Sequence, residues 1–272
     1  MRWLLWASMG VLGTVAVLGL ARNGGNKFVR TNSQQGCIAN YANIFGAEES
    51  NLLVCCTGGE DDADVCIGGR SEVTKTLTSL WSFLIPLLGL AANAACDHLT
   101  GGVTAERRRV RRNRFFLYVA VILLRTGVLY FALNALQGLL WREASSDCWY
   151  AQLRRNETCG DQFDFSDHAV LGVCQYFAIQ VFEMYCIAHE YSDAMSSPVD
   201  SKDSRGRRPS LSVGVIVAGV PLAVCAVVSG YSLALVYDTT AYFHTRGETV
   251  AALLLSWMAV VLPLLRVLTD EG

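Results

Sequence analysis

The sequence predicts an all-α polytopic membrane protein with about six transmembrane helices and with both termini in the cytosol. Of its 272 residues, 52% are hydrophobic and only 17% are charged, and the mean hydropathy is +0.33. A soluble domain of this length carries more charge and fewer long apolar runs. The arginines gather in two short segments, a pattern that marks the cytosolic connections between spans. We treat them as a topology signal and expect no nucleic-acid partner.

The first apolar run, residues 1–21, predicts a transmembrane signal anchor. About 20 apolar residues are enough to cross a bilayer, and this run is interrupted by one arginine and two hydroxyl side chains. A cleaved signal peptide stays open as the alternative, because Gly19-Leu20-Ala21 has the small-x-small form that a signal peptidase accepts. Either outcome sends residues 22–75 across the membrane into a lumen.

Residues 22–75 are predicted to form a polar lumenal loop that contains Cys37, Cys55, Cys56 and Cys66. Cysteines in polar loops indicate an oxidising compartment. Adjacent cysteines are poorly placed to bridge each other, so we expect Cys55 and Cys56 each to pair with Cys37 or Cys66, which leaves two connectivities open. A zinc site is the alternative, but no Cys-x-x-Cys spacing supports it.

The second and third spans are predicted at residues 76–96 and 115–141, as the start of a five-span bundle over residues 76–268. Arg125 lies near the middle of the third span. A charge at that depth is costly unless it faces other helices or a cavity, so Arg125 is a candidate for polar support of a site. The connection between the two spans is placed in the cytosol by its six arginines: Arg107, Arg108, Arg109, Arg111, Arg112 and Arg114.

The connection from residue 142 to residue 165 is then lumenal, and two of its features agree with that side. It contains Cys148 and Cys159, which we expect to form a disulfide. It also contains the sequon Asn156-Glu157-Thr158, which has meaning only in the secretory pathway.

The fourth span, residues 166–190, is unusually polar. Gln175, Gln180 and Glu183 would be costly against lipid, so this span should lie inside the bundle. We expect Glu183 to be the partner of Arg125. At 100° per residue, Glu183 is also about 60° from His168 around the helix, so both are expected to face one cavity.

A second basic segment, residues 193–210, returns the chain to the cytosol, and the fifth and sixth spans follow at residues 211–237 and 248–268. His168 stands at the start of the fourth span and His244 stands just before the sixth. The alternation of spans therefore places both histidines on the lumenal face.

Two histidines on one membrane face suit phosphoryl chemistry. A neutral imidazole is a competent nucleophile toward phosphorus, and a protonated imidazole supplies a proton to the leaving oxygen. Both states are accessible at neutral pH because the reference pKa of histidine is about 6.5. Backbone N–H groups at the start of the fourth span, Ser166 and Arg246 are candidates to stabilise the phosphoryl oxygens.

This scheme needs no metal and no cofactor. The competing chemistry is a metal centre formed by both histidines with Asp164 or Asp238, but nothing resembles a close ligand spacing. We therefore assign Asp164, together with Asp167 and Tyr242, to substrate positioning.

These residues resemble a known family. The stretch from Phe163 to His168, which follows Cys148 and Cys159, is similar to the lumenal Phe-Asp-(Ile/Phe)-Ser-Gly-His signature of the fat-storage-inducing transmembrane (FIT) proteins. The resemblance covers roughly residues 76–260. Further matches follow in the same order: His98-Leu99-Thr100-Gly101, Glu183-Met184, His189-Glu190 and Tyr242-Phe243-His244.

The resemblance implies an endoplasmic-reticulum acyl-CoA diphosphatase of the lipid-phosphatase-like class. Such proteins hydrolyse fatty acyl-CoA at the lumenal face to acyl 4′-phosphopantetheine and adenosine 3′,5′-bisphosphate, and they support lipid-droplet formation. It implies His244 as the nucleophile and His168 as the acid, with fatty acyl-CoA as the substrate and membrane lipids, including di- and triacylglycerol, as partners. His98 and His189 match the family too, but they fall on the cytosolic side, where we expect structural roles.

Asp167 departs from the family, because glycine is the family residue at this position. Its carboxylate either orients His168 or places a negative charge beside a polyanionic substrate, so altered substrate choice and reduced activity both stay open. Two other functions stay open for the chain. One is a phosphatase for a lipid monoester such as phosphatidate, and the other is a non-catalytic protein that binds neutral lipids and organises droplet budding. The second would tolerate replacement of both histidines.

Overall fold

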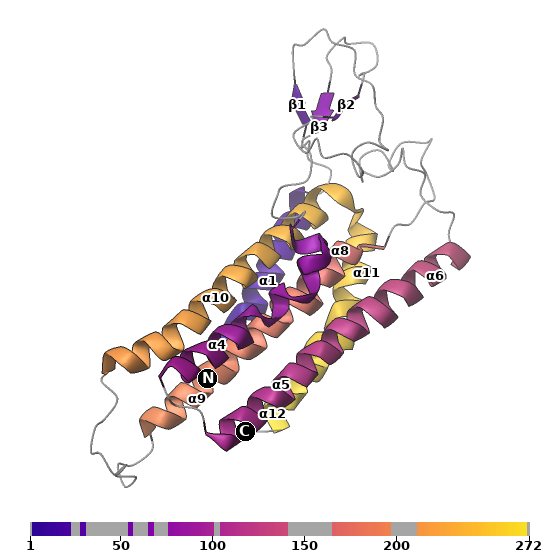
Figure 1. The fold of residues 1–272 in the computed structure, drawn as a ribbon. Helices are drawn as coiled ribbons and strands as arrows, with labels where there is room; N and C mark the ends of the chain where they lie inside the picture. Colours follow the sequence, from indigo (N-terminus) through magenta and orange to yellow (C-terminus); the bar gives the residue numbers. More distant parts are fainter. Residues whose placement is uncertain are drawn as a thin grey trace, which may run out of the picture.

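The computed structural model describes residues 2–22, 28–30, 54–56, 65–67, 76–100, 104–140, 165–196 and 211–270. Within these ranges, six helices are long and apolar enough to cross a membrane, and they form one bundle (Figure 1). The predicted fold class, an all-α polytopic membrane protein with six spans, is confirmed. The spans are Trp3–Arg22, Trp81–Leu99, Ala105–Leu139, Asp167–Ser192, Ala218–Ala241 and Arg246–Val267.

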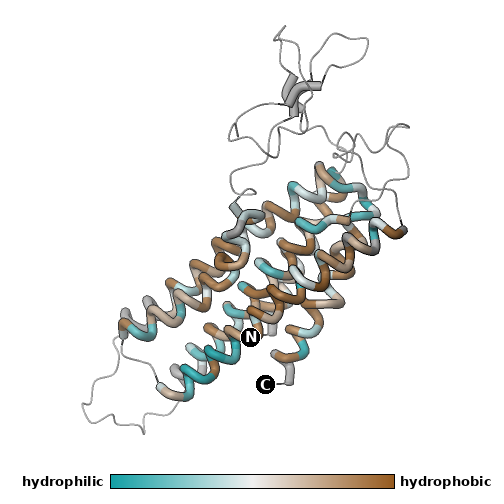
Figure 2. Tube along the Cα trace, turned by 45° about the vertical axis from the view of Figure 1, so that its right-hand side comes forward, coloured by the Kyte–Doolittle hydropathy of each residue, from teal (hydrophilic) through white to brown (hydrophobic). Residues whose placement is uncertain are grey.

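Several spans are built from successive helical segments. Hydrophobic residues dominate the helices between their two ends (Figure 2). The α-helices are α1 (Arg2–Arg22), α4 (Leu88–Leu99), α5 (Ala105–Leu123), α6 (Phe131–Leu140), α8 (Asp167–Val170), α9 (Ile179–Ser196), α10 (Leu211–Asp238), α11 (Arg246–Ser256) and α12 (Leu262–Asp270). The 3₁₀-helical segments are η1 (Leu80–Phe83) and η2 (Ile85–Leu87), and the π-helical segments are η3 (Leu124–Tyr130), η6 (Leu171–Ala178), η7 (Thr239–Phe243) and η8 (Trp257–Val261).

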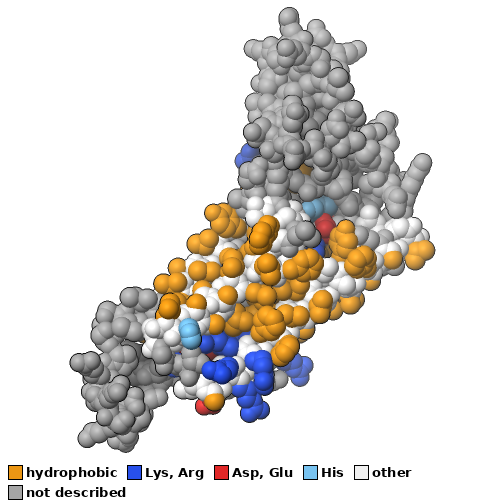
Figure 3. All heavy atoms as spheres, viewed as in Figure 1, with side chains coloured by type: hydrophobic (Ala, Val, Ile, Leu, Met, Phe, Trp, Pro, Cys, Tyr) orange, Lys and Arg blue, Asp and Glu red, His pale blue; other side chains and the backbone are white. Residues whose placement is uncertain are grey.

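The two ends of the bundle differ in charge. We call the end where α8 and α11 begin the histidine end, because His168 and His244 lie there. The opposite end, where α4 finishes and α5 begins, is the arginine end. Basic side chains gather at this second end of the apolar belt (Figure 3), and both chain termini lie toward it (Figure 1).

The fourth span is the centre of the bundle, as its polar content predicts. In its most apolar window 83% of the residues are buried, the largest share of any span, and Gln175, Gln180 and Glu183 are all fully buried. The core around it is formed by apolar side chains such as Val173 and Ile179, also fully buried. The prediction that this span lies inside the bundle is therefore confirmed.

The second span is not the uniform helix predicted at residues 76–96. Pro86 has no N–H to donate to the carbonyl of Ser82, and the chain forms 3₁₀ turns there before α4 begins. Side chains of the fourth span supply the missing donors: Gln175 Nε2 donates to the Ser82 carbonyl, and Gln180 Nε2 donates to the Pro86 carbonyl at 2.6 Å. Buried backbone acceptors inside a membrane protein need such partners, so these glutamines have a structural role.

The third span begins about ten residues earlier than predicted. The arginine segment, which the sequence analysis assigned to a cytosolic loop, is helical from Ala105, and the Thr104 hydroxyl accepts from the Arg107 N–H at 3.2 Å as its N-cap. The loop assignment was wrong because hydropathy counts each arginine as exposed, whereas Arg111 and Arg114 are buried against carboxylates. Helix α9 of the fourth span continues to Ser196, α10 of the fifth span ends at Asp238, and α11 of the sixth span begins at Arg246.

The predicted lumenal loop contains a small antiparallel sheet in the order β1-β3-β2, with β1 (Phe28–Arg30), β2 (Val54–Cys56) and β3 (Val65–Ile67). The register sets the Cα of Cys55 opposite that of Cys66. Cys37, Cys148 and Cys159 lie outside the described residues. The disulfide pairings stay predictions.

The first helix is an integral part of the bundle. Leu5, Met9, Leu12 and Ala16 are buried along one seam, where α1 packs against α9, α10 and η7. Near its end, a Cβ added to Gly19 would lie 1.9 Å from Thr240 Oγ1, so only glycine allows this close approach. Retention of the helix as an anchor, rather than its cleavage, stays a prediction.

The close contact at Gly19 can be tested with Gly19→Ala. The added methyl group must push α1 away from the β-branched Thr240, so we expect a loss of about 1–3 kcal/mol in the free energy of unfolding, measured by denaturant titration in mixed micelles. Gly13→Ala is the matched control on the same helix, because a Cβ there meets nothing within 4 Å. Equal effects of the two substitutions would contradict this packing.

Candidate functional site

Both candidate histidines lie at the histidine end, on neighbouring segments. His168 is the second residue of α8, and His244 ends η7 just before the Thr245 N-cap of α11. The first turn of α8 packs against both α11 and η7. The sequence argument from alternating spans and the structure therefore agree on a common end for the two side chains.

His168 is held by the carboxylate beside it. Its Nδ1 lies 2.8 Å from Asp167 Oδ1, and the two side chains are 19% and 32% exposed. An imidazole that donates from Nδ1 carries its lone pair on Nε2 when neutral, so this contact selects the tautomer and fixes the plane of the ring. Asp167, the departure from the family signature, thus orients His168.

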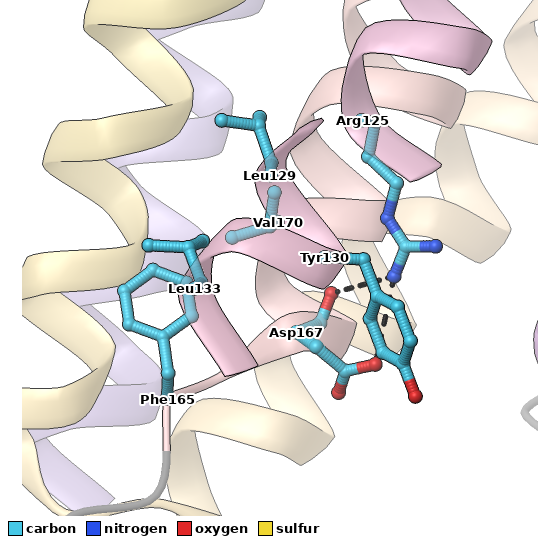
Figure 4. A pocket seen from close by; sticks show the side chains of 7 residues that line it. All are labelled: Arg125, Leu129, Tyr130, Leu133, Phe165, Asp167 and Val170. Carbon is cyan, nitrogen blue, oxygen red and sulfur yellow. Dashed lines mark hydrogen bonds and ion pairs between the residues drawn. The ribbon is translucent and has the colours of Figure 1, made fainter. Parts of the chain in front are cut away.

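Arg125 holds Asp167 in turn (Figure 4). Its Nη2 lies 3.5 Å from Asp167 Oδ2 and donates to the Asp167 backbone carbonyl at 3.2 Å. The guanidinium also lies 5.5 Å from the centre of the Tyr130 ring, a favourable cation–π distance. Arg125 therefore connects the π-helical middle of the third span to the start of the fourth.

A crevice opens beside this pair, between the third span and the start of the fourth. Its polar side is Arg125 with Asp167, and the rest of its lining is mostly apolar (Figure 4). The Phe165 N–H donates to Gln137 Oε1 at 3.0 Å, which ties α6 to the chain just before α8. The lining residues are Arg125, Leu129, Tyr130, Leu133, Phe165, Asp167 and Val170.

His244 has a carboxylate partner that the sequence analysis missed. Its Nδ1 lies 3.5 Å from Glu248 Oε2, and the same oxygen accepts from the Thr245 N–H at 2.7 Å. Glu248 is 1% exposed and completes a capping box with Thr245. The spacing Thr-x-x-Glu was the signal that could have found it, because it predicts a carboxylate folded back to the start of the helix.

The two histidines share one electrostatic environment. Arg125, His168 and His244 all interact electrostatically with the Asp167 carboxylate, although they come from three different spans or their connections. His244 itself is only 5% exposed. The site is thus a buried to half-buried cluster in which each imidazole faces a carboxylate through Nδ1.

The remaining predicted site residues are distributed differently. Arg246 is exposed at the first position of α11, where it can meet an anion, whereas Ser166 is fully buried below α8. Asp164 and the side chain of Tyr242 lie outside the described part of the chain. Among the described residues, no group of three or more His, Cys, Asp or Glu side chains could hold a metal ion.

The predicted pairing of Arg125 with Glu183 is wrong. Glu183 lies toward the arginine end, where Arg114 Nη1 is 3.2 Å from its Oε1, Asn93 Nδ2 donates to the same atom at 3.2 Å, and the Tyr118 hydroxyl donates to Oε2. The prediction considered only the angle around the helix, whereas 16 residues separate Asp167 from Glu183, about 24 Å along the axis. His168 and Glu183 therefore do not face one cavity.

The other two histidines, His98 and His189, lie on α4 and α9 toward the arginine end. They lie at the opposite end from His168 and His244, as the alternation of spans predicts, and their structural roles stay a prediction. No protein-family model, curated protein sequence or solved structure matches the chain.

A double-mutant cycle can test the corrected pairing. Arg114→Leu and Glu183→Leu should couple by more than roughly 1 kcal/mol in the free energy of unfolding, because each single change leaves a buried charge without its partner. Arg125→Leu and Glu183→Leu should be additive within about 0.5 kcal/mol, because the two side chains do not meet. Strong coupling of the second pair would restore the original prediction.

Proposed function

We propose that the chain is a lumenal fatty acyl-CoA diphosphatase of the endoplasmic reticulum, which hydrolyses acyl-CoA to acyl 4′-phosphopantetheine and adenosine 3′,5′-bisphosphate. The observation that carries this proposal is the pair of carboxylate-held imidazoles at neighbouring span ends, His168 with Asp167 at 2.8 Å and His244 with Glu248 at 3.5 Å. A nucleophile and an acid, each oriented by its own carboxylate, are the groups that phosphoanhydride hydrolysis requires.

In this mechanism, neutral His244 attacks one phosphorus of the anhydride. An N–P bond forms, the bridging P–O bond breaks, and protonated His168 gives its proton to the departing oxygen. His168, now neutral, then takes a proton from water as the water attacks the phosphoryl group on His244, which restores both residues. Glu248 and Asp167 act by orienting the imidazoles and by stabilising their protonated forms.

Of the two arginines near the histidines, only one is available to bind an anionic substrate. The N-terminal end of α11 offers a favourable dipole, and exposed Arg246 stands at its first position. Arg125 is already paired with Asp167, so its role is to neutralise that carboxylate and not to bind phosphate. We therefore assign substrate positioning to Arg246 and the orientation of His168 to Arg125 with Asp167.

Three further observations support the membrane side and the substrate. The arginines at the opposite end of the bundle are typical of a cytosolic side, and six of the ten cysteines, together with the Asn156 sequon, lie on the connections expected in the lumen. The Phe-Asp-Phe-Ser-Asp-His stretch resembles the FIT signature, which points to acyl-CoA as the substrate and to lipid-droplet formation as the process. The departure at Asp167 is compatible with activity, because the side chain is used to hold His168.

The direct test is release of adenosine 3′,5′-bisphosphate from oleoyl-CoA by the purified protein in detergent. We expect release by the wild type, with His168→Ala and His244→Ala each reducing it at least 100-fold. Wild-type protein that is folded yet inactive toward oleoyl-CoA would overturn the proposal. Hydrolysis of phosphatidate instead would identify a lipid monoesterase, and inactivity toward both would favour a lipid-binding protein.

The orienting role of Asp167 predicts a specific kinetic change. Asp167→Asn keeps the shape of the side chain but removes the charge, so we expect kcat to fall about 10- to 100-fold while KM changes little. Glu106→Gln is the control, because Glu106 is exposed in the first turn of α5 at the other end of the bundle. An unchanged kcat in Asp167→Asn would show that the carboxylate is merely tolerated.

A further inference from the structure

The six arginines at the start of α5 divide into two groups on two faces of the helix. At 100° per residue, Arg107, Arg111 and Arg114 fall within roughly 60° of one another and face the bundle. Arg108, Arg109 and Arg112 fall within roughly 100° on the opposite side. All three of this second group are exposed.

The inward group is neutralised by the bundle. Arg111 pairs with buried Asp97, and Arg107 Nη1 lies 3.6 Å from the same carboxylate. Arg114 pairs with Glu183 and Glu190. These arginines hold the second, third and fourth spans together at the arginine end, and their charge is not available to a ligand.

The outward group keeps its charge. Within the described part of the chain, no carboxylate lies within ion-pair distance of Arg108, Arg109 or Arg112. Topology alone does not account for this difference, because the positive-inside effect counts charges and not faces. Three uncompensated guanidinium groups are thus concentrated within about one and a half turns of one helix.

The outward face also shows at what depth these groups lie. Phe115 and Phe116 follow on the same face, 42% and 60% exposed, and they begin the apolar surface of the third span. Basic side chains lie together at this boundary of the apolar belt (Figure 3). Phe115 and Phe116 are the first large apolar side chains on this face, so the guanidinium groups one to two turns earlier stand just outside the apolar belt, at the level of the lipid phosphates.

We propose that Arg108, Arg109 and Arg112 form a binding surface for anionic phospholipids in the leaflet at the arginine end of the bundle. The guanidinium group matches a phosphate with two parallel N–H donors, and a basic surface beside an anionic leaflet attracts its headgroups. A lipid is the occupant because the face continues directly into the lipid-facing Phe115 and Phe116. This surface lies at the opposite end from the histidines and does not depend on the hydrolase.

The test uses the full-length protein in lipid nanodiscs of phosphatidylcholine with a minority of phosphatidylserine. Electron paramagnetic resonance of spin-labelled lipids then gives the preference of protein-contacting lipid for phosphatidylserine over phosphatidylcholine. The wild type should prefer phosphatidylserine several-fold, and the preference should weaken at high salt. The variant R108Q/R109Q/R112Q should lose most of it, because it lacks the three positive charges that attract anionic headgroups.

The matched control is R108K/R109K/R112K, which keeps the three charges and should retain most of the preference. The thermal midpoints of all three proteins should agree, because the outward arginines make no ion pair in the described structure. A wild type without preference for phosphatidylserine would overturn the proposal. A preference that survives in the glutamine variant would overturn it too, because the anionic lipid would then be bound elsewhere.

Discussion

The structure depends on the pairing of arginines in the third span with carboxylates in the fourth. Arg125 pairs with Asp167 at the histidine end, and Arg114 pairs with Glu183 toward the arginine end. Within an apolar bundle an unpaired charge is costly, by several kcal/mol on common scales, so the two antiparallel spans are stable only where both pairs form. The two arginines are eleven residues apart, about three helical turns, and therefore face the fourth span from one side of the helix. The register between these spans follows from this pairing.

The positions of the candidate site residues depend on the same pairing between the third and fourth spans. Arg125 holds Asp167, and Asp167 holds His168 at the point where the central helix begins. His244 is positioned by the capping box of α11. Buried Glu248 completes this capping box and also faces the imidazole of His244. One histidine is thus positioned by packing between spans and the other by the start of its own helix. The proposed nucleophile and acid are for this reason oriented by independent parts of the fold.

Much of this architecture was predictable from the sequence, and the misses have physical causes. Hydropathy identified six spans, the polar load of Gln175, Gln180 and Glu183 placed the fourth span inside, and alternation brought His168 and His244 to one end. The partner of Arg125 was missed because an angle around a helix ignores distance along its axis. The start of α5 was missed because a charged residue paired inside a bundle looks like a loop residue in a hydropathy profile. The contact of Glu248 with His244 was predictable, because the Thr-x-x-Glu spacing indicates a capping box that folds this carboxylate back to the start of α11, but this motif was overlooked.

We propose that His168 and His244 form one phosphoryl-transfer site in which the two residues have unequal roles. The most direct test is mass spectrometry of protein quenched in alkaline denaturant during turnover of oleoyl-CoA, because a phosphoryl group on histidine is lost in acid, with mapping of any covalent adduct to its residue. We expect an adduct on His244 that is scarce in the wild type and persists longer in His168→Ala, where the residue that activates water is missing. An adduct on His168, or active protein without any adduct on His244 at early quench times, would contradict it.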